Sequence, residues 1–314
     1  MRTLFVSIAS YCDPVLPFTL QRAVETARHP DGLHFGIVDQ ALPGMEAASQ
    51  PPATRVSEVR IDALQARGPC WARAIALSLY DGEDWFLQLD SHMDFEAGWD
   101  EKLVEQARAL GAPERGIVIS SYPPAFAFEA GRPVLRGPGG GVLAHVLKPG
   151  VAFEADHPVL SFEAHPVDGE APLPAFHLGA GCLFAPGRFA QAFPYDPWFY
   201  FHGEEQALAL RLYTHGWDLF HMPRLPIRHL YNDAQSGAPP RPLHWDAAHE
   251  ALRSEPWWAR EQRSRDRLAA LVAGEPLGAY GLGCQRSVAD YAAFSGIDYA
   301  ARTLAPHAFT PKLA

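Results

Sequence analysis

From residue 4 to residue 121 the chain alternates short apolar runs with segments of helical spacing. The apolar runs have the length and composition of buried strands and cover residues 4–9, 34–38, 85–89 and 116–121, with a further candidate at 56–61. The segments of helical spacing between them are residues 18–28, 70–80 and 98–110. This alternation predicts an open, mostly parallel sheet with helices on both faces. In such sheets ligands bind at the carboxyl ends of the strands.

The second half of the chain departs from this pattern. Residues 122–175 hold many Pro and Gly residues, including the run 137–141, and their short β-like stretches predict a hairpin-rich insertion. A helix at 201–214 and short strands at 218–221 and 227–229 are expected to follow. We expect residues 236–314 to form a helical C-terminal extension packed on a first domain of residues 1–235.

Composition excludes several classes of protein. The net charge is −10 and there is no dense Lys/Arg run, so a nucleic-acid partner is not expected. No apolar stretch approaches the roughly 20 residues of a membrane span, and the apolar run at 4–9 is better interpreted as a strand than as a signal peptide. Four widely spaced cysteines form no CxxC pair, which argues against structural zinc and favours a reducing, cytoplasmic location.

Asp90-Ser91-His92 directly follows the apolar run 85–89. The Asp-x-His spacing places a carboxylate and an imidazole on the same side of an extended chain. Oxygen and nitrogen ligands together suit a borderline cation such as Mn²⁺. His229, at the end of a late predicted strand, is the best candidate for a third ligand. Taken alone, the tripeptide is better interpreted as a polar strand-to-loop turn, because three residues are weak evidence for a metal site.

Further motifs lie in order along nearly the whole chain. They are Phe5-Val6-Ser7-Ile8-Ala9-Ser10-Tyr11, the stretch 72–92, Gly98-Trp99-Asp100, Gly179-Ala180-Gly181, Pro194-Tyr195-Asp196-Pro197, Gly203-Glu204-Glu205, the stretch 214–218, His229-Leu230-Tyr231-Asn232 and residues 280–287. In these motifs the chain resembles a family of GlcNAc-transferases that includes a cytoplasmic enzyme modifying protein hydroxyproline. That family is itself similar to the mucin-type polypeptide GalNAc-transferases.

The resemblance implies a GT-A fold, a Rossmann-like mixed sheet flanked by helices. It also implies a UDP-sugar donor, with GlcNAc as the sugar, and a Mn²⁺ or Mg²⁺ ion held by Asp90, His92 and His229. Transfer to a hydroxyl acceptor would retain the anomeric configuration. The acceptor remains open between a protein hydroxyl (hydroxyproline, Ser or Thr), a small molecule and a glycan. A non-catalytic nucleotide-sugar or glycan-binding protein is the alternative, whereas a phosphohydrolase would require more clustered carboxylates.

The resemblance also suggests roles for individual residues. Glu204 and Glu205 are candidates for catalysis and for binding sugar hydroxyls, although carboxylates at a helix start are also favoured by the helix dipole. Either could be a nucleophile, but we favour a front-face substitution in which the leaving phosphate takes the acceptor proton. The expected nucleotide-binding residues are Ser7, Ala9, Tyr11, Gln40, Arg73 and Ser91, and the expected sugar-binding residues are Gly179, Ala180, Gly181, Glu204 and Glu205.

Overall fold

The computed structural model describes residues 3–45, 54–136, 141–232 and 236–312. Most of the Pro/Gly run at 137–141 and the expected domain boundary at residue 235 lie outside the described residues.

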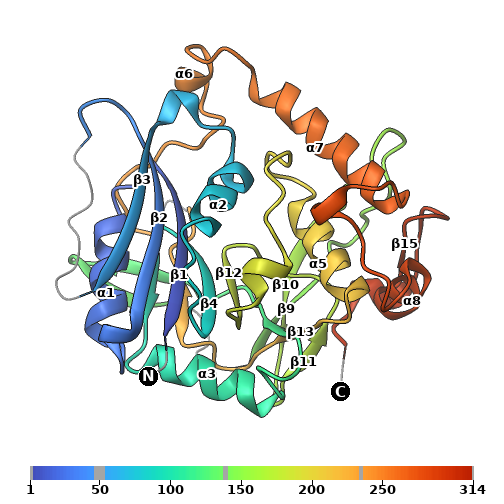
Figure 1. Cartoon of the computed structure of the whole chain (residues 1–314), viewed down its shortest axis with the longest axis horizontal. Helices are drawn as coiled ribbons and strands as arrows, with labels where there is room; N and C mark the ends of the chain where they lie inside the picture. Colours follow the sequence, from blue (N-terminus) through green and yellow to red (C-terminus); the bar gives the residue numbers. More distant parts are fainter. Residues whose placement is uncertain (1–2, 46–53, 137–140, 233–235, 313–314) are drawn as a thin grey trace.

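Within the described part of the chain, a mostly parallel eight-stranded sheet forms the centre of the molecule (Figure 1). β1, β2, β3 and β4 run parallel to one another, while β12 lies antiparallel between β4 and β6. The expected mostly parallel sheet is therefore confirmed. In order across the sheet the strands are β11 (Leu173–Ala175), β13 (Asp218–His221), β6 (Ile117–Ile119), β12 (Cys182–Pro186), β4 (Trp85–Asp90), β1 (Leu4–Tyr11), β2 (Leu33–Ala41) and β3 (Arg55–Asp62).

Helices cover both faces of this sheet, as the alternating sequence predicts (Figure 1). α1 and α3 pack on one face, and α2, α4 and α5 pack on the other. The helices are α1 (Leu16–Thr26), α2 (Pro69–Leu77), α3 (Trp99–Ala109), α4 (Phe189–Ala192), α5 (Glu204–Thr214), α6 (Ala247–Glu250), α7 (Trp257–Val272) and α8 (Val288–Ser295), with short 3-10 turns at Pro30–Gly32, Ala63–Gln65, Gly278–Tyr280 and Pro306–Phe309.

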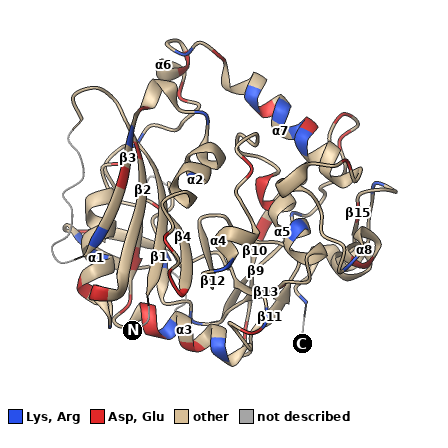
Figure 2. Cartoon of the chain, in the orientation of Figure 1, with Lys and Arg blue, Asp and Glu red and all other residues tan. Residues whose placement is uncertain are grey.

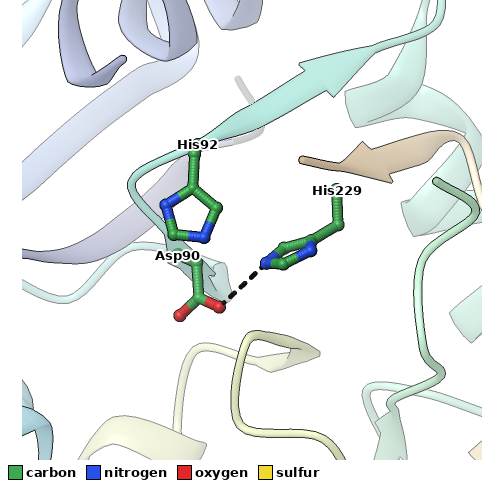
Figure 3. A group of neighbouring side chains, drawn as sticks. All are labelled: Asp90, His92 and His229. Atoms are coloured by element: carbon green, nitrogen blue, oxygen red, sulfur yellow. Dashed lines mark hydrogen bonds and ion pairs between the residues drawn. The ribbon is translucent and has the colours of Figure 1, made fainter. Parts of the chain in front are cut away.

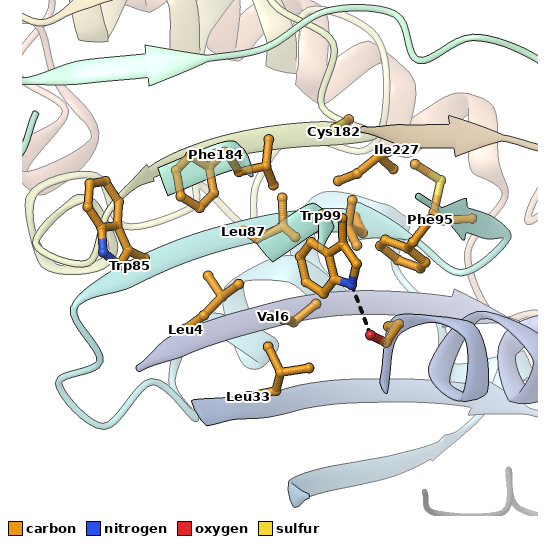
Figure 4. Packing of buried hydrophobic residues seen from close by; sticks show 14 of the residues in the cluster. Leu4, Val6, Leu33, Trp85, Leu87, Phe95, Trp99, Cys182, Phe184 and Ile227 are labelled. Carbon is orange, nitrogen blue, oxygen red and sulfur yellow. Dashed lines mark hydrogen bonds between the residues drawn. The ribbon is translucent and has the colours of Figure 1, made fainter. Parts of the chain in front are cut away.

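Alternation of side chains along the strands creates two hydrophobic layers, because successive residues of a strand point to opposite faces. Leu4 and Val6 of β1 join the layer beneath α1 and α3, whereas Phe5 joins the layer beneath α2 and α4. Figure 4 shows the first layer around Trp99, a fully buried residue of α3. Its indole Nε1 donates a hydrogen bond of 2.9 Å to the carbonyl of Ala23, which ties α3 to α1.

Four small sheets complete the strand structure of the described residues. Residues 122–175 contain hairpins, as expected, but the last strand of this segment, β11, is an edge strand of the central sheet. The expected strand at 227–229 is present, yet it pairs with β5, a strand that the sequence did not indicate, and not with the central sheet. The small sheets are β5 (Met93–Phe95) with β14 (Ile227–His229), β7 (Phe126–Glu129) with β8 (Arg132–Leu135), β9 (Val142–Leu147) with β10 (Phe162–Val167), and β15 (Ile297–Asp298) with β16 (Thr303–Leu304).

The C-terminal helices α7 and α8 pack against α5. α7 carries charges of both signs along its length (Figure 2). Its arginines are paired with carboxylates: Arg260 and Arg263 contact Glu255, and Arg267 contacts Asp196. The positive charge of α7 is thus largely neutralised by neighbouring side chains.

No helix among the described residues is both long enough and apolar enough to cross a membrane.

Candidate active site

A cavity of about 360 Å³ opens at the carboxyl edge of the sheet, beside the ends of β1, β2 and β4. Because β12 is antiparallel to β4, the loop that precedes β12 also reaches this edge, where Gly181 O accepts a hydrogen bond from Asp90 N. Apart from Ser7, every residue that the sequence assigned to the site lines the cavity: Ala9, Tyr11, Gln40, Arg73, Asp90, Ser91, His92, Gly179, Ala180, Gly181, Glu204, Glu205 and His229.

Asp90, His92 and His229 come together at the end of β4 (Figure 3). One ligand atom from each lies within 4.8 Å of those of the other two, and His229 Nε2 is 3.3 Å from Asp90 Oδ2. Within the described ranges, this is the one group of three or more His, Cys, Asp and Glu side chains that could hold a metal ion. A carboxylate with two imidazoles fits Mn²⁺.

The small β5–β14 sheet places His229 in this group. β5 begins directly after the Asp90–His92 turn, and β14 pairs with it so that His229 lies opposite Met93. Leu230 N donates to His92 O at 3.0 Å, which closes the pairing beside the metal-binding turn. Two residues far apart in sequence are therefore brought together by backbone hydrogen bonds, independently of any metal.

Asp13 orients His92 from outside the metal group. Its Oδ2 lies 2.7 Å from His92 Nδ1 and accepts a second hydrogen bond, of 2.6 Å, from Ser91 Oγ. Burial alone would raise the pKa of Asp13, but the hydrogen bonds from His92 and Ser91 outweigh it, and the pKa lies below its ordinary value. An ionised carboxylate only accepts, so Nδ1 of His92 carries the proton and Nε2 keeps its lone pair for a metal.

Thr19 of α1 fixes the backbone of the same turn. Its buried hydroxyl donates to Ser91 O at 2.8 Å and accepts from Met93 N at 2.9 Å. The two bonds span His92 on either side and anchor the turn to a helix.

Arg73 and Glu204 form a buried ion pair behind Asp90. Arg73 donates to Glu204 Oε1 at 2.8 Å and to Asp90 Oδ1 at 3.1 Å. Glu204 Oε2 accepts from Cys70 Sγ and from Tyr195 Oη, so both of its oxygens are occupied. Burial alone would raise the pKa of Asp90, but the hydrogen bond from His229 and the charge of Arg73 lower it far below its ordinary value.

Glu205 is placed differently from its neighbour. It is about one-third exposed to the cavity, and its Oε1 accepts a hydrogen bond of 2.7 Å from Ala180 N. Ala180 belongs to the Gly179–Gly181 loop, which lies close against the metal group: a Cβ at Gly181 would stand 2.5 Å from Asp90 Oδ2. Glycine is therefore required at position 181 by close approach to the carboxylate.

The expected nucleotide-binding residues divide into two groups. Ser7 is buried within β1 and does not line the cavity. Tyr11 and Gln40 do line it. Gln40 donates through Nε2 to Ser10 O, while its buried Oε1 has no hydrogen-bond partner among the described residues.

The C-terminal part of the chain holds Tyr11 from the other side. Tyr11 Oη accepts from Arg253 at 2.6 Å and lies 2.6 Å from His249 Nδ1. Burial raises the pKa of Tyr11 to about 12 although the Arg253 charge opposes the shift, so the phenol is protonated at neutral pH.

Sequence reasoning missed the contribution of residues 241–245, all of which line the cavity. Arg241 is nine-tenths buried there, and its Nη1 has no hydrogen-bond partner in the described part of the chain. This segment is Pro-rich and lacks periodicity, so its sequence carries no signal of its position. Tyr122 and Tyr231, which also line the cavity, were missed as site residues, although Tyr231 lies in the motif that follows His229.

Replacing Thr19 with Val should loosen the metal-binding turn. Two buried hydrogen bonds are lost and Met93 N is left unsatisfied, so we expect a loss of about 1–3 kcal/mol in the free energy of unfolding and weaker Mn²⁺ binding. Denaturant unfolding and calorimetric titration with Mn²⁺ measure the two effects. Thr26→Val is the matched control, because Thr26 lies in the same helix and its hydroxyl donates to Arg22 O of that helix; equal Mn²⁺ affinity in both variants would contradict this role.

The two glutamates should differ in stability. Glu204→Gln weakens the buried ion pair with Arg73, so we expect a loss of about 3 kcal/mol in the free energy of unfolding. This value is at the low end of the range for breaking a buried ion pair, because Asp90 still compensates the charge of Arg73. Glu205→Gln alters a partly exposed group and should stay within about 1 kcal/mol of the unsubstituted protein. Denaturant unfolding of both variants gives the comparison, and equal losses would show that the burial of Glu204 has no energetic consequence.

The fold has relatives among solved structures, while no curated protein matches the chain. One match is the crystal structure of GalNAc-T7 with UDP, GalNAc and Mn²⁺, with a TM-score of 0.52 and 14% sequence identity. The alignment covers 76% of this chain and 45% of that one, so the chain spans less than half the length of that protein. At this identity the likeness shows the fold, and the expected GT-A fold is confirmed.

A family model identifies the protein family, which the structural likeness alone does not. The model described as "Glycosyltransferase (GlcNAc)" matches residues 41–301, which include the metal group, the Gly179–Gly181 loop, both glutamates and residues 241–245. The chain therefore belongs to this glycosyltransferase (GlcNAc) family.

Proposed function

We propose that the protein transfers GlcNAc from UDP-GlcNAc to a hydroxyl acceptor, with retention of anomeric configuration and with Mn²⁺ or Mg²⁺ bound. The observation that carries the proposal is the group Asp90, His92 and His229, preorganised in one cavity with the Gly179–Gly181 loop and Glu205. The GalNAc-T7 structure, which contains UDP and Mn²⁺, supports a UDP-sugar donor and a divalent metal.

The residues of the metal group fit a divalent cation. Asp90 is held ionised, and His92 presents Nε2 because Asp13 holds its other nitrogen. Two imidazole ligands favour Mn²⁺ over Mg²⁺, which prefers oxygen. When bound, the cation would neutralise the diphosphate and stabilise it as a leaving group.

Arg241 is suited to the diphosphate as well. Its Nη2 donates to Leu230 O, and its Nη1 forms a long ion pair of 3.9 Å with Asp13 Oδ2 but has no hydrogen-bond partner among the described residues. A guanidinium N–H without a hydrogen-bond partner is a strong donor to phosphate oxygen. Tyr11 and Gln40 line the cavity near Asp13 and are proposed to contact the nucleoside, together with Ala9 and Ser91.

We propose that retention proceeds by front-face substitution. A carboxylate nucleophile needs a free oxygen, but both oxygens of Glu204 are bonded, to Arg73 on one side and to Cys70 and Tyr195 on the other. Glu205 is anchored at Ala180 and faces the cavity, so it is assigned to sugar hydroxyls. Mass spectrometry that trapped a glycosyl adduct on either glutamate would replace this proposal with a double displacement.

The test of the proposal is a donor screen. The purified protein is incubated with UDP-GlcNAc, UDP-GalNAc or UDP-glucose in the presence of Mn²⁺, and UDP release is measured with EDTA as the metal-free control. We expect release from UDP-GlcNAc that EDTA abolishes. His92→Gln should lower it roughly 100-fold or more, because even outer-shell partners of a metal are worth about 10–100-fold. His307→Gln, at an exposed position, is the matched control.

The alternative is a non-catalytic nucleotide-sugar or glycan-binding protein. Such a protein would bind UDP with Mn²⁺ in calorimetry without releasing UDP from any donor or transferring sugar to any acceptor. The preorganised metal group favours the enzyme, because binding alone does not require a group that stabilises a leaving diphosphate.

A second cavity is proposed to receive the acceptor. It measures about 530 Å³, lies beneath the β7–β8 and β9–β10 hairpins, and shares Ser121, Tyr122, Pro123 and Tyr231 with the donor cavity. An acceptor seated there would meet the donor across this shared wall. The acceptor class stays open between a protein hydroxyl, a small molecule and a glycan.

The substitution Leu143→Arg tests whether the second cavity receives the acceptor, because Leu143 is partly exposed in β9 and lines that cavity. A charge in this apolar wall should raise the KM for the acceptor at least about tenfold, a loss of about 1.4 kcal/mol, while hydrolysis of the donor by water is unchanged. Val134→Arg, on the exposed side of β8 outside the cavity, is the control. A similar KM in both variants would exclude the second cavity as the acceptor site.

Residues 1–235 are proposed as the catalytic domain and 236–314 as an extension packed on it, although residues 241–245 of the extension line the donor cavity. A cytoplasmic location is also proposed. It is supported by the four free cysteines, three of them buried and not paired with one another.

A further inference from the structure

Glu205 has a buried neighbour to which neither the sequence nor the reaction assigns a role. His177, in the loop between β11 and β12, is almost fully buried, and its Nε2 lies 3.6 Å from Glu205 Oε2. Phe162 of β10 stacks flat on its ring, with centroids 3.4 Å apart and planes 6° from parallel. The imidazole is therefore held by packing, with one edge toward the carboxylate.

Neither ring nitrogen of His177 makes a hydrogen bond within the described ranges. Buried polar groups in native proteins nearly always have a partner, so an unpartnered imidazole requires an explanation. The available acceptor is Glu205 Oε2, which lies just beyond hydrogen-bond distance of His177 Nε2. Glu205 is also the movable member of the pair, because its side chain is about one-third exposed while His177 is enclosed.

Among the described residues, the imidazoles near His177 supply no charge that competes with Glu205. His145 and His221 lie beyond it, and burial lowers the pKa of His221 to about 4 and that of His145 well below its ordinary value. Both imidazoles are neutral at physiological pH. The charged group that faces His177 is therefore Glu205.

The other oxygen of Glu205 already has a rigid anchor. Ala180 N donates to Oε1, and the Gly179–Gly181 loop is fixed in turn by Ser120, whose hydroxyl bonds both the N–H and the C=O of Gly179. His145 packs so closely on this loop that a Cβ at Gly179 would stand 2.9 Å from its ring. One carboxylate oxygen is thus fixed, and rotation about that anchor decides where the other points.

We propose that His177 is a positioning residue for Glu205: its Nε2–H donates to Oε2 and, with Ala180 N–H, fixes the carboxylate in the orientation that accepts hydrogen bonds from the donor sugar. This inference rests on the proposed function in naming the sugar, whereas the contact between His177 and Glu205 does not depend on it. His177 itself does not line the cavity.

Paired substitutions at position 177 test the proposal. Gln places an amide N–H near the position of Nε2, whereas Asn reaches only the position of Nδ1, and Phe keeps the stacking on Phe162 without a donor. Calorimetry with Mn²⁺ compares UDP, which lacks the sugar, with UDP-GlcNAc. We expect His177→Phe and His177→Asn to bind UDP within about twofold of the unsubstituted protein but UDP-GlcNAc about 5- to 10-fold more weakly, the value of one ordinary hydrogen bond. His177→Gln should recover most of this loss.

A double-mutant cycle shows whether the effect passes through Glu205. Glu205→Gln alone should weaken UDP-GlcNAc binding, and adding His177→Phe to it should cause no further loss beyond about twofold. Independent, multiplying losses would overturn the proposal, as would equal weakening of UDP and UDP-GlcNAc in the His177 variants, which would indicate a purely structural role. Should His177→Phe fail to fold, the Gln and Asn variants alone carry the comparison.

A crystal structure of the unsubstituted protein gives a readout that does not depend on the donor. We expect the distance from His177 Nε2 to Glu205 Oε2 to fall within 3.2 Å, the limit of an ordinary hydrogen bond. A distance that stays beyond about 3.5 Å, with or without UDP-GlcNAc, overturns the contact. Failure of every UDP-sugar to bind more tightly than UDP would instead overturn the proposed donor, while the crystallographic distance would still decide the role of His177.

Discussion

The carboxylate of Asp90 organises the site, because four separate parts of the fold meet on it. It ends the central strand β4, accepts from the buried Arg73 of α2, lies 3.3 Å from His229 of β14, and has Gly181 packed against it. The Asp90 side chain keeps 30% of its surface exposed, and a carboxylate withdrawn from water to that extent is costly unless it is paired and hydrogen-bonded. The surrounding groups satisfy that requirement and at the same time hold Asp90 ionised, which is the form that binds a metal.

Much of this arrangement follows from patterns in the sequence. The apolar runs of β1, β2 and β4 are buried on both faces, so their composition alone indicates parallel strands, and their carboxyl ends locate the cavity. The Asp-x-His spacing at the end of β4 indicates two candidate metal ligands because strand geometry is local. These parts are predictable because each depends on neighbours in the chain.

The remainder depends on contacts that local pattern cannot encode. β5 is only three residues long and pairs with β14 more than a hundred residues later, so His229 could be suggested by resemblance but not by periodicity. Glu204 and Glu205 are adjacent in sequence, and only the tertiary structure shows that one is sealed behind Arg73 while the other faces the cavity. Ser7 was assigned to the site from its motif; it shares a strand face with Ala9 and Tyr11, which line the cavity, but it is buried farther from the carboxyl end of β1. Arg241 lies in a Pro-rich segment, and the path of that segment is determined by tertiary packing and not by a local sequence pattern.

The charges that line the cavity beside Asp90 bear on the proposal that a metal and a diphosphate bind there together. Among the described lining residues, the carboxylates are Asp13, Asp90, Glu204 and Glu205, and the fixed cations are Arg73 and Arg241. The cavity therefore carries two more negative than positive charges and would repel a diphosphate, in a protein whose net charge is already −10. Under the proposed function, a divalent cation would cancel that excess, and Nη1 of Arg241, which has no hydrogen-bond partner among the described residues, would add an attraction specific to phosphate. The acidic surplus thus supports the proposal that the metal binds first and that the bound metal lets the cavity accept a nucleotide-sugar.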